Sequence, residues 1–312
     1  MKTVIRKYCT LIAFVFLSSS LHAQLFLEDL NLYSDQILYK KIHDNPDINQ
    51  YYPFVDGHGN YPDLNARKEF PKKIALISFY VWDEQLIEDK KSPTAFWNES
   101  TWINVDGENR LSGELAKYSI SSIQHRFDSL GSKVIIPEEF TAEQRKAYDS
   151  IQIHYISSYR KKVPDSIQYD LCSASQFRFI KLPVQKLDYK FSDDMALLAK
   201  ALNVDAVLIV ENQIKYNGVT GVLQKITLNM YGDNPIAKPS GDSSAHKKGH
   251  IYNEGLLYLS MEMEMESIFT QYDEKKQITY ESYLGYDRLL MLMIDQFYIN
   301  YEKRTLIAPK KS

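Results

Sequence analysis

The sequence predicts an α+β (α/β-like) fold: a single mixed β-sheet with two hairpins, packed by helices and preceded by a helical amino-terminal extension. Three observations predict it. Residues 74–81 form a continuous apolar run of strand length, several stretches carry apolar residues three and four positions apart, and residues 257–266 alternate between apolar and polar. The chain has 312 residues, 44% of them hydrophobic and 25% charged. Its mean hydropathy of −0.37 excludes a polytopic membrane protein.

The amino terminus has the three parts of a secretory signal peptide. Residues 1–7 are basic, Cys9 to Leu17 are apolar, and a short polar stretch ends at Ala23, so we expect cleavage before Gln24. No cysteine follows the apolar stretch, so the pattern for lipid attachment is missing. Removing residues 1–23 leaves 34 basic against 40 acidic residues, a net charge of −6. That charge does not favour nucleic acid as a partner. We therefore expect a protein exported to the periplasm, the outer membrane or the medium, peripheral to a membrane at most.

The mature chain divides into three predicted parts. Residues 24–70 form the amino-terminal extension, with short helices before residue 42 and turns after it; residues 71–304 form the mixed α/β core domain, and residues 305–312 a tail. Cys172 is the only thiol left after cleavage, which rules out an intramolecular disulfide. A buried small apolar side chain is the favoured role for it.

The first half of the core is predicted to form a strand, a helix and a second strand. The run at 74–81 predicts a strand covered on both faces. Residues 83–110 form a polar, irregular insertion. Apolar residues recur at helical spacing over residues 111–130, and Gly131 is suited to end that helix. Residues 133–136 form the next strand.

Two further helices precede the next strand. Thr141 and Gln144 form a capping box that opens a helix extending to about Lys162. Residues 176–182 fit either a short strand or a loop. Ser192 is the expected N-cap of another helix, which leads into a strand at 206–210 that extends to Tyr216.

The two hairpins follow. Asn217-Gly218 is a strong turn signal, and residues 223–230 form its return strand. Residues 233–250 form a long loop. The alternating strand at 257–266 is then expected to pair with a return strand at 278–284, and a helix over residues 286–301 closes the core.

Several segments together resemble a known family. They are the strand Lys73–Phe79, a helix and strand ending at Ile136-Pro137, and the passage Leu197–Leu208. This order resembles the periplasmic α/β domain shared by the curli-secretion outer-membrane component and the amino-terminal domain of the Tol-system propeller protein. The resemblance implies an assembly, export or scaffold role and no catalytic residues. It also implies that the Asp205 carboxylate binds backbone amides where a helix meets a strand. This chain lacks the lipid-carrying cysteine and evident pore-forming hairpins, so a pore is not implied.

No motif predicts catalytic residues, a metal site or a cofactor. The sequence has no nucleophile elbow, no phosphate-binding loop and no dinucleotide fingerprint. His246 and His250 lie four apart beside two lysines, which makes a poor metal site. Residues 56–60 lack the alternating acids of a calcium loop and favour a turn. A pair of carboxylates that meet only in space, as in glycosidases, stays open.

The candidate binding residues are Trp97 and Trp102, in the polar insertion. Loop aromatics stack on sugars or anchor a protein partner. The alternative is that both side chains fold back over the sheet as a lid.

Together these features favour an exported, non-enzymatic envelope protein with a binding, scaffolding, assembly or export role. An envelope protein or a glycan is the expected partner; the sequence does not indicate the oligomeric state. Two alternatives stay open: a secreted hydrolase acting on glycan or peptide, and a glycan-binding module that uses the loop aromatics.

Overall fold

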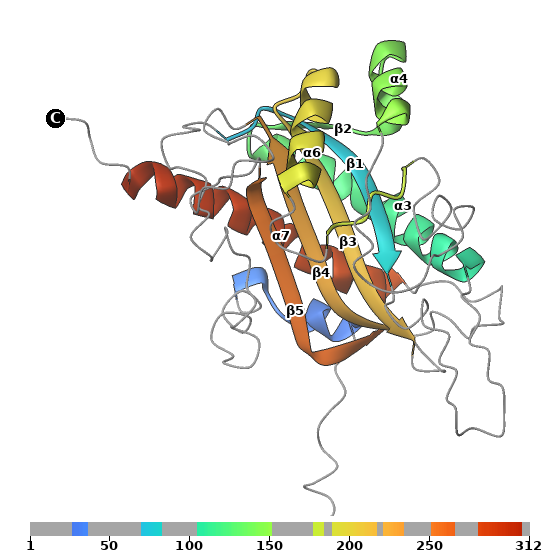
Figure 1. Ribbon diagram of the computed structural model, residues 1–312. Helices are drawn as coiled ribbons and strands as arrows, with labels where there is room; N and C mark the ends of the chain where they lie inside the picture. Colours follow the sequence, from blue (N-terminus) through green and yellow to red (C-terminus); the bar gives the residue numbers. More distant parts are fainter. Residues whose placement is uncertain are drawn as a thin grey trace, which may run out of the picture.

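The computed structural model describes eight segments of the chain: residues 27–36, 70–82, 105–151, 177–183, 189–216, 221–233, 251–265 and 280–307. They form one five-stranded mixed sheet covered by helices (Figure 1). The predicted fold class is therefore confirmed. The strands are β1 (Lys73–Trp82), β2 (Lys133–Ile135), β3 (Ala206–Tyr216), β4 (Gly221–Gly232) and β5 (Ile251–Met265).

The sheet has the order β2-β1-β3-β4-β5. β1 is parallel to both β2 and β3, β4 is antiparallel to β3, and β5 is antiparallel to β4. The parallel strands are joined through helices, as parallel pairs require. β3 and β4 are joined by only four residues, in agreement with the hairpin predicted at Asn217-Gly218. Those two residues lie outside the described part of the chain.

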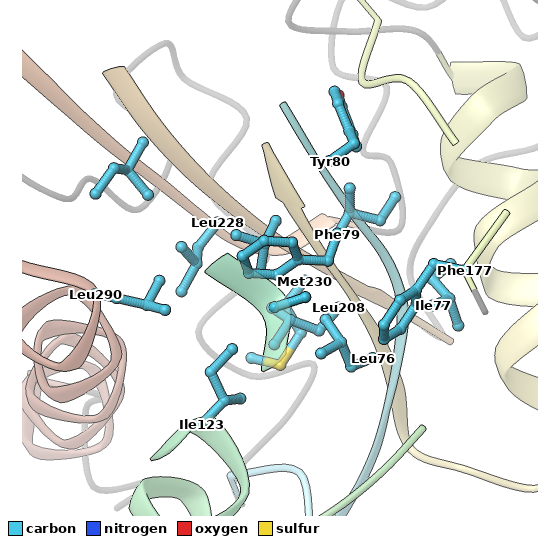
Figure 2. Packing of buried hydrophobic residues seen from close by; sticks show 14 of the residues in the cluster. Leu76, Ile77, Phe79, Tyr80, Ile123, Phe177, Leu208, Leu228, Met230 and Leu290 are labelled. Carbon is cyan, nitrogen blue, oxygen red and sulfur yellow. The ribbon is translucent and has the colours of Figure 1, made fainter. Parts of the chain in front are cut away.

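The helices cover both faces of the sheet. α3 (Val105–Ser129) and α7 (Tyr280–Ile307) lie on one face, and α6 (Tyr189–Ala201) lies on the other, in front of β3 and β4 in Figure 1. The short helices are η1 (Leu27–Leu32), η4 (Pro137–Glu139) and α4 (Ala142–Ser150). In Figure 2, Leu290 of α7 and Ile123 of α3 point toward Leu228 and Met230 of the sheet. Since every residue from Ile74 to Val81 is fully buried, the predicted strand covered on both faces is confirmed.

Residues 27–36 pack on α7. Leu27 and Leu30 of η1 are buried, and the Arg288 guanidinium of α7 binds the main-chain carbonyl oxygen of Leu30. Gly285 is required there, because a Cβ atom at this position would overlap the carbonyl oxygen of Leu27. Residues 27–36 therefore belong to the same hydrophobic core as the sheet.

Several helix boundaries follow the sequence signals. Gly131 has a φ of 81°, as expected of a residue that ends a helix. The Thr141 hydroxyl accepts from the Gln144 N–H at 3.2 Å, and the Gln144 side chain accepts from the Thr141 N–H at 2.9 Å, which confirms the capping box. Thr141 is therefore the N-cap of α4.

The prediction of a return strand at 278–284 is wrong. Residues 280–284 form the first turns of α7, and β5 pairs with β4 instead. Tyr280, Tyr283 and Leu284 also fit helical spacing, and burial of Tyr283 and Tyr286 against the core favours the helix. Residues 280–284 therefore fit the spacing of both a strand and a helix, and tertiary packing selects the helix.

Two other helix boundaries differ from the predictions. α6 begins at Tyr189, so Ser192 lies inside the helix rather than at its N-cap. Phe191 packs edge-to-face on Tyr231 of β4 at 5.4 Å, which explains why the helix includes it. α4 ends at Ser150 rather than near Lys162, and Ile151 is extended.

Asp205 fastens the start of β1 to β3. Its Oδ2 atom accepts the main-chain N–H groups of Lys72 and Lys73, both at 2.9 Å, and its own N–H donates to the Lys73 carbonyl oxygen. The predicted structural role of this carboxylate is confirmed. Hydrogen bonds to an ionised acceptor are stronger than neutral ones.

We expect Asp205→Ala to lower the free energy of unfolding by about 1–3 kcal/mol, because two strand N–H groups lose their acceptor. Urea unfolding followed by circular dichroism measures the change. Asp149→Ala is the matched control: among the described residues Asp149 pairs with Arg145 alone, one helical turn away on an exposed surface, so we expect about 0.5 kcal/mol or less. Equal effects of the two substitutions would contradict this role for Asp205.

Candidate functional site

The sheet face opposite α3 and α7 carries an extended chain segment. We call residues 177–183 the strap, and we call this whole face of the sheet, from β1 across β3 to β4, the strap face. The strap lies in front of β1 and β3 in Figure 1. It has no regular secondary structure, yet Ile180 is fully buried and Phe179 and Leu182 are nearly so. The strand considered for residues 176–182 is thus an extended segment that binds the sheet through side chains.

Alternate main-chain N–H groups of the strap donate to three side-chain hydroxyl oxygens, two of them on β1 and one on α4. The pairs are Arg178 N–H to Tyr148 at 2.7 Å, Ile180 N–H to Ser78 at 3.1 Å and Leu182 N–H to Tyr80 at 2.9 Å. These three bonds use main-chain donors, while the buried side chains of Phe179, Ile180 and Leu182 add apolar contacts to the binding.

Each of these hydroxyl groups also donates a hydrogen bond. Tyr148 donates to the Ile77 carbonyl oxygen at 2.6 Å, and Ser78 donates to the Arg178 carbonyl oxygen at 2.9 Å. Tyr80 donates to the Glu211 carboxylate at 2.5 Å. Burial raises the pKa of the Tyr148 hydroxyl, so it stays a neutral donor. These hydroxyls therefore act as fixed bridges between the strap and the sheet.

Local structure explains how these groups meet. Ser78 and Tyr80 alternate along β1 and so face the same side, while Phe79 faces α3 and α7. Tyr148 comes from α4. The Arg178 guanidinium donates to the carbonyl oxygens of Tyr148 and Ile151 at the carboxyl end of α4. Carbonyl groups at a helix end lack partners within the helix, so the arginine closes α4.

A buried ion pair continues from Tyr80. The second oxygen of Glu211 binds the Lys225 ammonium at 3.0 Å, and the two side chains are 7% and 16% exposed. The carboxylate thus has two charge-assisted partners from neighbouring strands. A buried pair of this kind tolerates the loss of neither member, since the other charge would remain without compensation.

β4 presents a polar row to the same face. Lys225, Thr227, Asn229 and Tyr231 alternate with apolar residues that face α3 and α7, and the alternation usually marks a solvated face. Here Thr227 and Asn229 are only 4% and 7% exposed. Within the described segments, Thr227 Oγ1 and Asn229 Oδ1 have no hydrogen-bond partner. Burying such atoms is costly, which makes this row the best candidate for a binding position.

A second polar cluster lies on the opposite face, between β3 and α7. The Tyr286 hydroxyl donates to Asn212 at 2.8 Å, and the Asn212 amide donates to the Tyr80 carbonyl oxygen at 3.2 Å. Nearby, the Tyr283 hydroxyl donates to Asp287 at 3.2 Å. Burial raises the pKa of Asp287, and hydrogen bonds from Ser122 and Tyr283 only partly oppose it. This cluster anchors α7 to the sheet.

The residues predicted for binding fall outside the described part of the chain. This applies to Trp97 and Trp102, and also to Cys172, His246 and His250. His125 is described and lies exposed on α3. Among the eight described segments, no group of three or more histidine, cysteine or acidic residues could hold a metal ion. None of the helices in those segments is both long and apolar enough to cross a membrane.

The sequence analysis missed the strap face because it assigned β4 only by its apolar residues. The signal that could have found it was the alternation itself: Lys225, Thr227 and Asn229 occupy every second position in a strand expected beside a covered one. Glu211 gave a similar signal, since a charged residue directly follows the apolar run 206–210 of β3.

Neither protein-family models, nor curated proteins, nor solved structures match the chain. The resemblance to the curli-secretion and Tol-system domain therefore stays a prediction.

We expect Tyr80→Phe to lower the free energy of unfolding by about 1–3 kcal/mol, because the Leu182 N–H loses its acceptor and Glu211 loses a donor. Urea unfolding measures the change, and hydrogen exchange at Leu182 should accelerate. Ser150→Ala is the control, as its exposed hydroxyl donates to the Ala147 carbonyl oxygen of its own helix. An unchanged exchange rate at Leu182 would show that the phenol does not hold the strap.

Asp287 should make stability depend on pH in a defined direction. Its folded-state pKa lies above the ordinary value of 3.8, so the native state binds more protons than the unfolded state just above that pH. The contribution of Asp287 is fully present below pH 3.8 and is lost as the pH rises through the folded pKa. We therefore expect Asp287→Asn to gain stability relative to wild type as the pH rises. Urea unfolding from pH 3.5 to 7.5 tests this, and a constant difference would contradict it.

Proposed function

We propose that this protein is an exported, non-enzymatic component of the cell envelope that binds polypeptide during assembly or export. The signal-peptide pattern of residues 1–23 motivates the compartment. The chemistry of the strap face motivates the activity.

One observation carries the proposal. Three hydroxyl side chains, from β1 and α4, accept successive alternate N–H groups of an extended peptide segment. Acceptors with such spacing bind main-chain N–H groups, which every residue except proline carries, and this suits a protein that handles polypeptide segments. The hydroxyls of Ser78 and Tyr80 are already engaged as bridges, and Glu211 is bound by Tyr80 and Lys225. These groups are therefore better suited to structural binding than to activating a nucleophile.

Two measurements on the mature protein test the proposal together. The first is a pull-down from native envelope fractions, read by mass spectrometry, with heat-unfolded protein as the control bait. We expect a reproducible polypeptide partner that the folded bait alone retains. The second is hydrolysis of envelope glycans and peptides by wild type and by Glu211→Gln.

The hydrolysis assay separates the proposal from the hydrolase alternative. We expect no turnover that depends on Glu211, the acidic residue most deeply buried on the strap face. Robust hydrolysis that Glu211→Gln abolishes would overturn the non-enzymatic assignment. Retention of polysaccharide alone, lost on substituting Trp97 and Trp102, would favour a glycan-binding module instead.

A further inference from the structure

Two oxygen atoms on β4 lack partners on a face that already binds peptide. Thr227 Oγ1 and Asn229 Oδ1 are buried, and no hydrogen bond reaches them from the residues that the structure describes. The Asn229 amide nitrogen is engaged, since it lies 3.2 Å from the Tyr231 hydroxyl. With the nitrogen engaged in this way, the Oδ1 atom is the end of the amide that can accept a hydrogen bond from a ligand.

The spacing of the two residues matches an extended peptide. Thr227 and Asn229 lie two apart on one strand, so their Cα atoms are separated by about 6.8 Å along β4. Alternate N–H groups of an extended chain recur at about the same distance. The strap shows the same chemistry on the same face, where Ser78 and Tyr80, also two apart on a strand, accept the N–H groups of Ile180 and Leu182.

The charge around the two oxygens favours an uncharged ligand group. On one side, Lys225 is paired with Glu211, so the two charges compensate each other. On the other side, Tyr231 packs on Phe191 of α6. A phosphate or a metal ion would meet no excess of opposite charge here, whereas a neutral peptide group would meet an acceptor, a hydroxyl and aromatic surface.

We propose that Thr227 and Asn229 bind the main chain of an extended polypeptide segment from the partner, beside the strap and next to α6. This inference rests on the proposed function and names the position and the chemistry of its partner. The partner's alternate N–H groups donate to Thr227 Oγ1 and Asn229 Oδ1. Because both side chains are almost fully buried in the unbound protein, binding has to be coupled to a local rearrangement of this face, so association is slow.

Stability and binding should respond in opposite directions at Thr227. A buried hydroxyl without a partner destabilises the unbound fold, so an apolar side chain of the same shape should stabilise it. The same substitution removes the hydrogen bond to the partner. A hydroxyl that serves only to bind internal water would behave differently, since its replacement would lower stability and leave peptide binding unchanged.

The experiment uses the full mature protein and a fluorescent peptide with the sequence of residues 177–183, an extended segment that this face is seen to bind. Fluorescence anisotropy measures its affinity for wild type, Thr227→Val, Thr227→Ser and Ser121→Ala. The same peptide N-methylated at residues 178–182 lacks the main-chain donors and is the control probe. A chitin oligosaccharide tests the face for sugar.

We expect Thr227→Val to weaken peptide binding about tenfold and to raise the urea midpoint. Thr227→Ser keeps the hydroxyl and should keep the affinity, as should Ser121→Ala on the exposed surface of α3. The N-methylated peptide should not bind.

Any of four results overturns the inference. The first three are no binding of the peptide to wild type, equal binding of the peptide to wild type and Thr227→Val, and equal binding of the N-methylated probe. The fourth is that Thr227→Val loses binding of the oligosaccharide but keeps binding of the peptide. If the envelope partner is retained by wild type and Thr227→Val alike, this position is wrong while the proposed function stands. If wild type retains no partner, the proposed function fails, and the peptide assay still decides the chemistry of this face.

Discussion

The architecture depends on how the first residues of β1 are fixed between two neighbouring strands. Asp205 accepts the N–H groups of Lys72 and Lys73 from one side. From the other side, the Lys133 N–H donates to the Lys72 carbonyl oxygen and the Ser132 hydroxyl to Pro71. Parallel strands are distant in sequence, so a register between them needs such specific contacts. Both neighbours leave a helix through a residue of positive φ, Gly131 and Asn203, which aims each chain into the sheet.

This register determines what each face of the sheet can do. A bulge in β1 between Leu76 and Ser78 shifts the pairing with β3, and after it Ser78 and Tyr80 lie under the strap. One position out of register would place these hydroxyls among the apolar residues of α3 and α7. The Tyr80 hydroxyl could then no longer reach both Glu211 and the Leu182 N–H. The strap face is therefore a consequence of the contacts at the opposite end of β1.

The two faces use polar groups differently. Under α7, the Asn212–Tyr286 hydrogen bond lies within an apolar layer and orients the helix, because few other arrangements would satisfy both groups. On the strap face, polar side chains form a continuous layer from Ser78 across Glu211 to Asn229. Some of them bind the protein's own extended segment, and two of their oxygens bind nothing in the described residues. A cost in stability at such a position is typical of a site selected for binding.

The sequence by itself determined the local features: the strand at 74–81, the capping box of Thr141 and the helix end at Gly131. Each depends on contacts within a few residues or on a pattern with one period. Tertiary structure alone decided where patterns were short or mixed. Residues 280–284 fit both a strand and a helix, and burial of Tyr283 and Tyr286 selected the helix. Likewise, polar and apolar residues alternate along β4, but only the tertiary packing determined that its polar face is buried, because burial depends on segments far away in the chain.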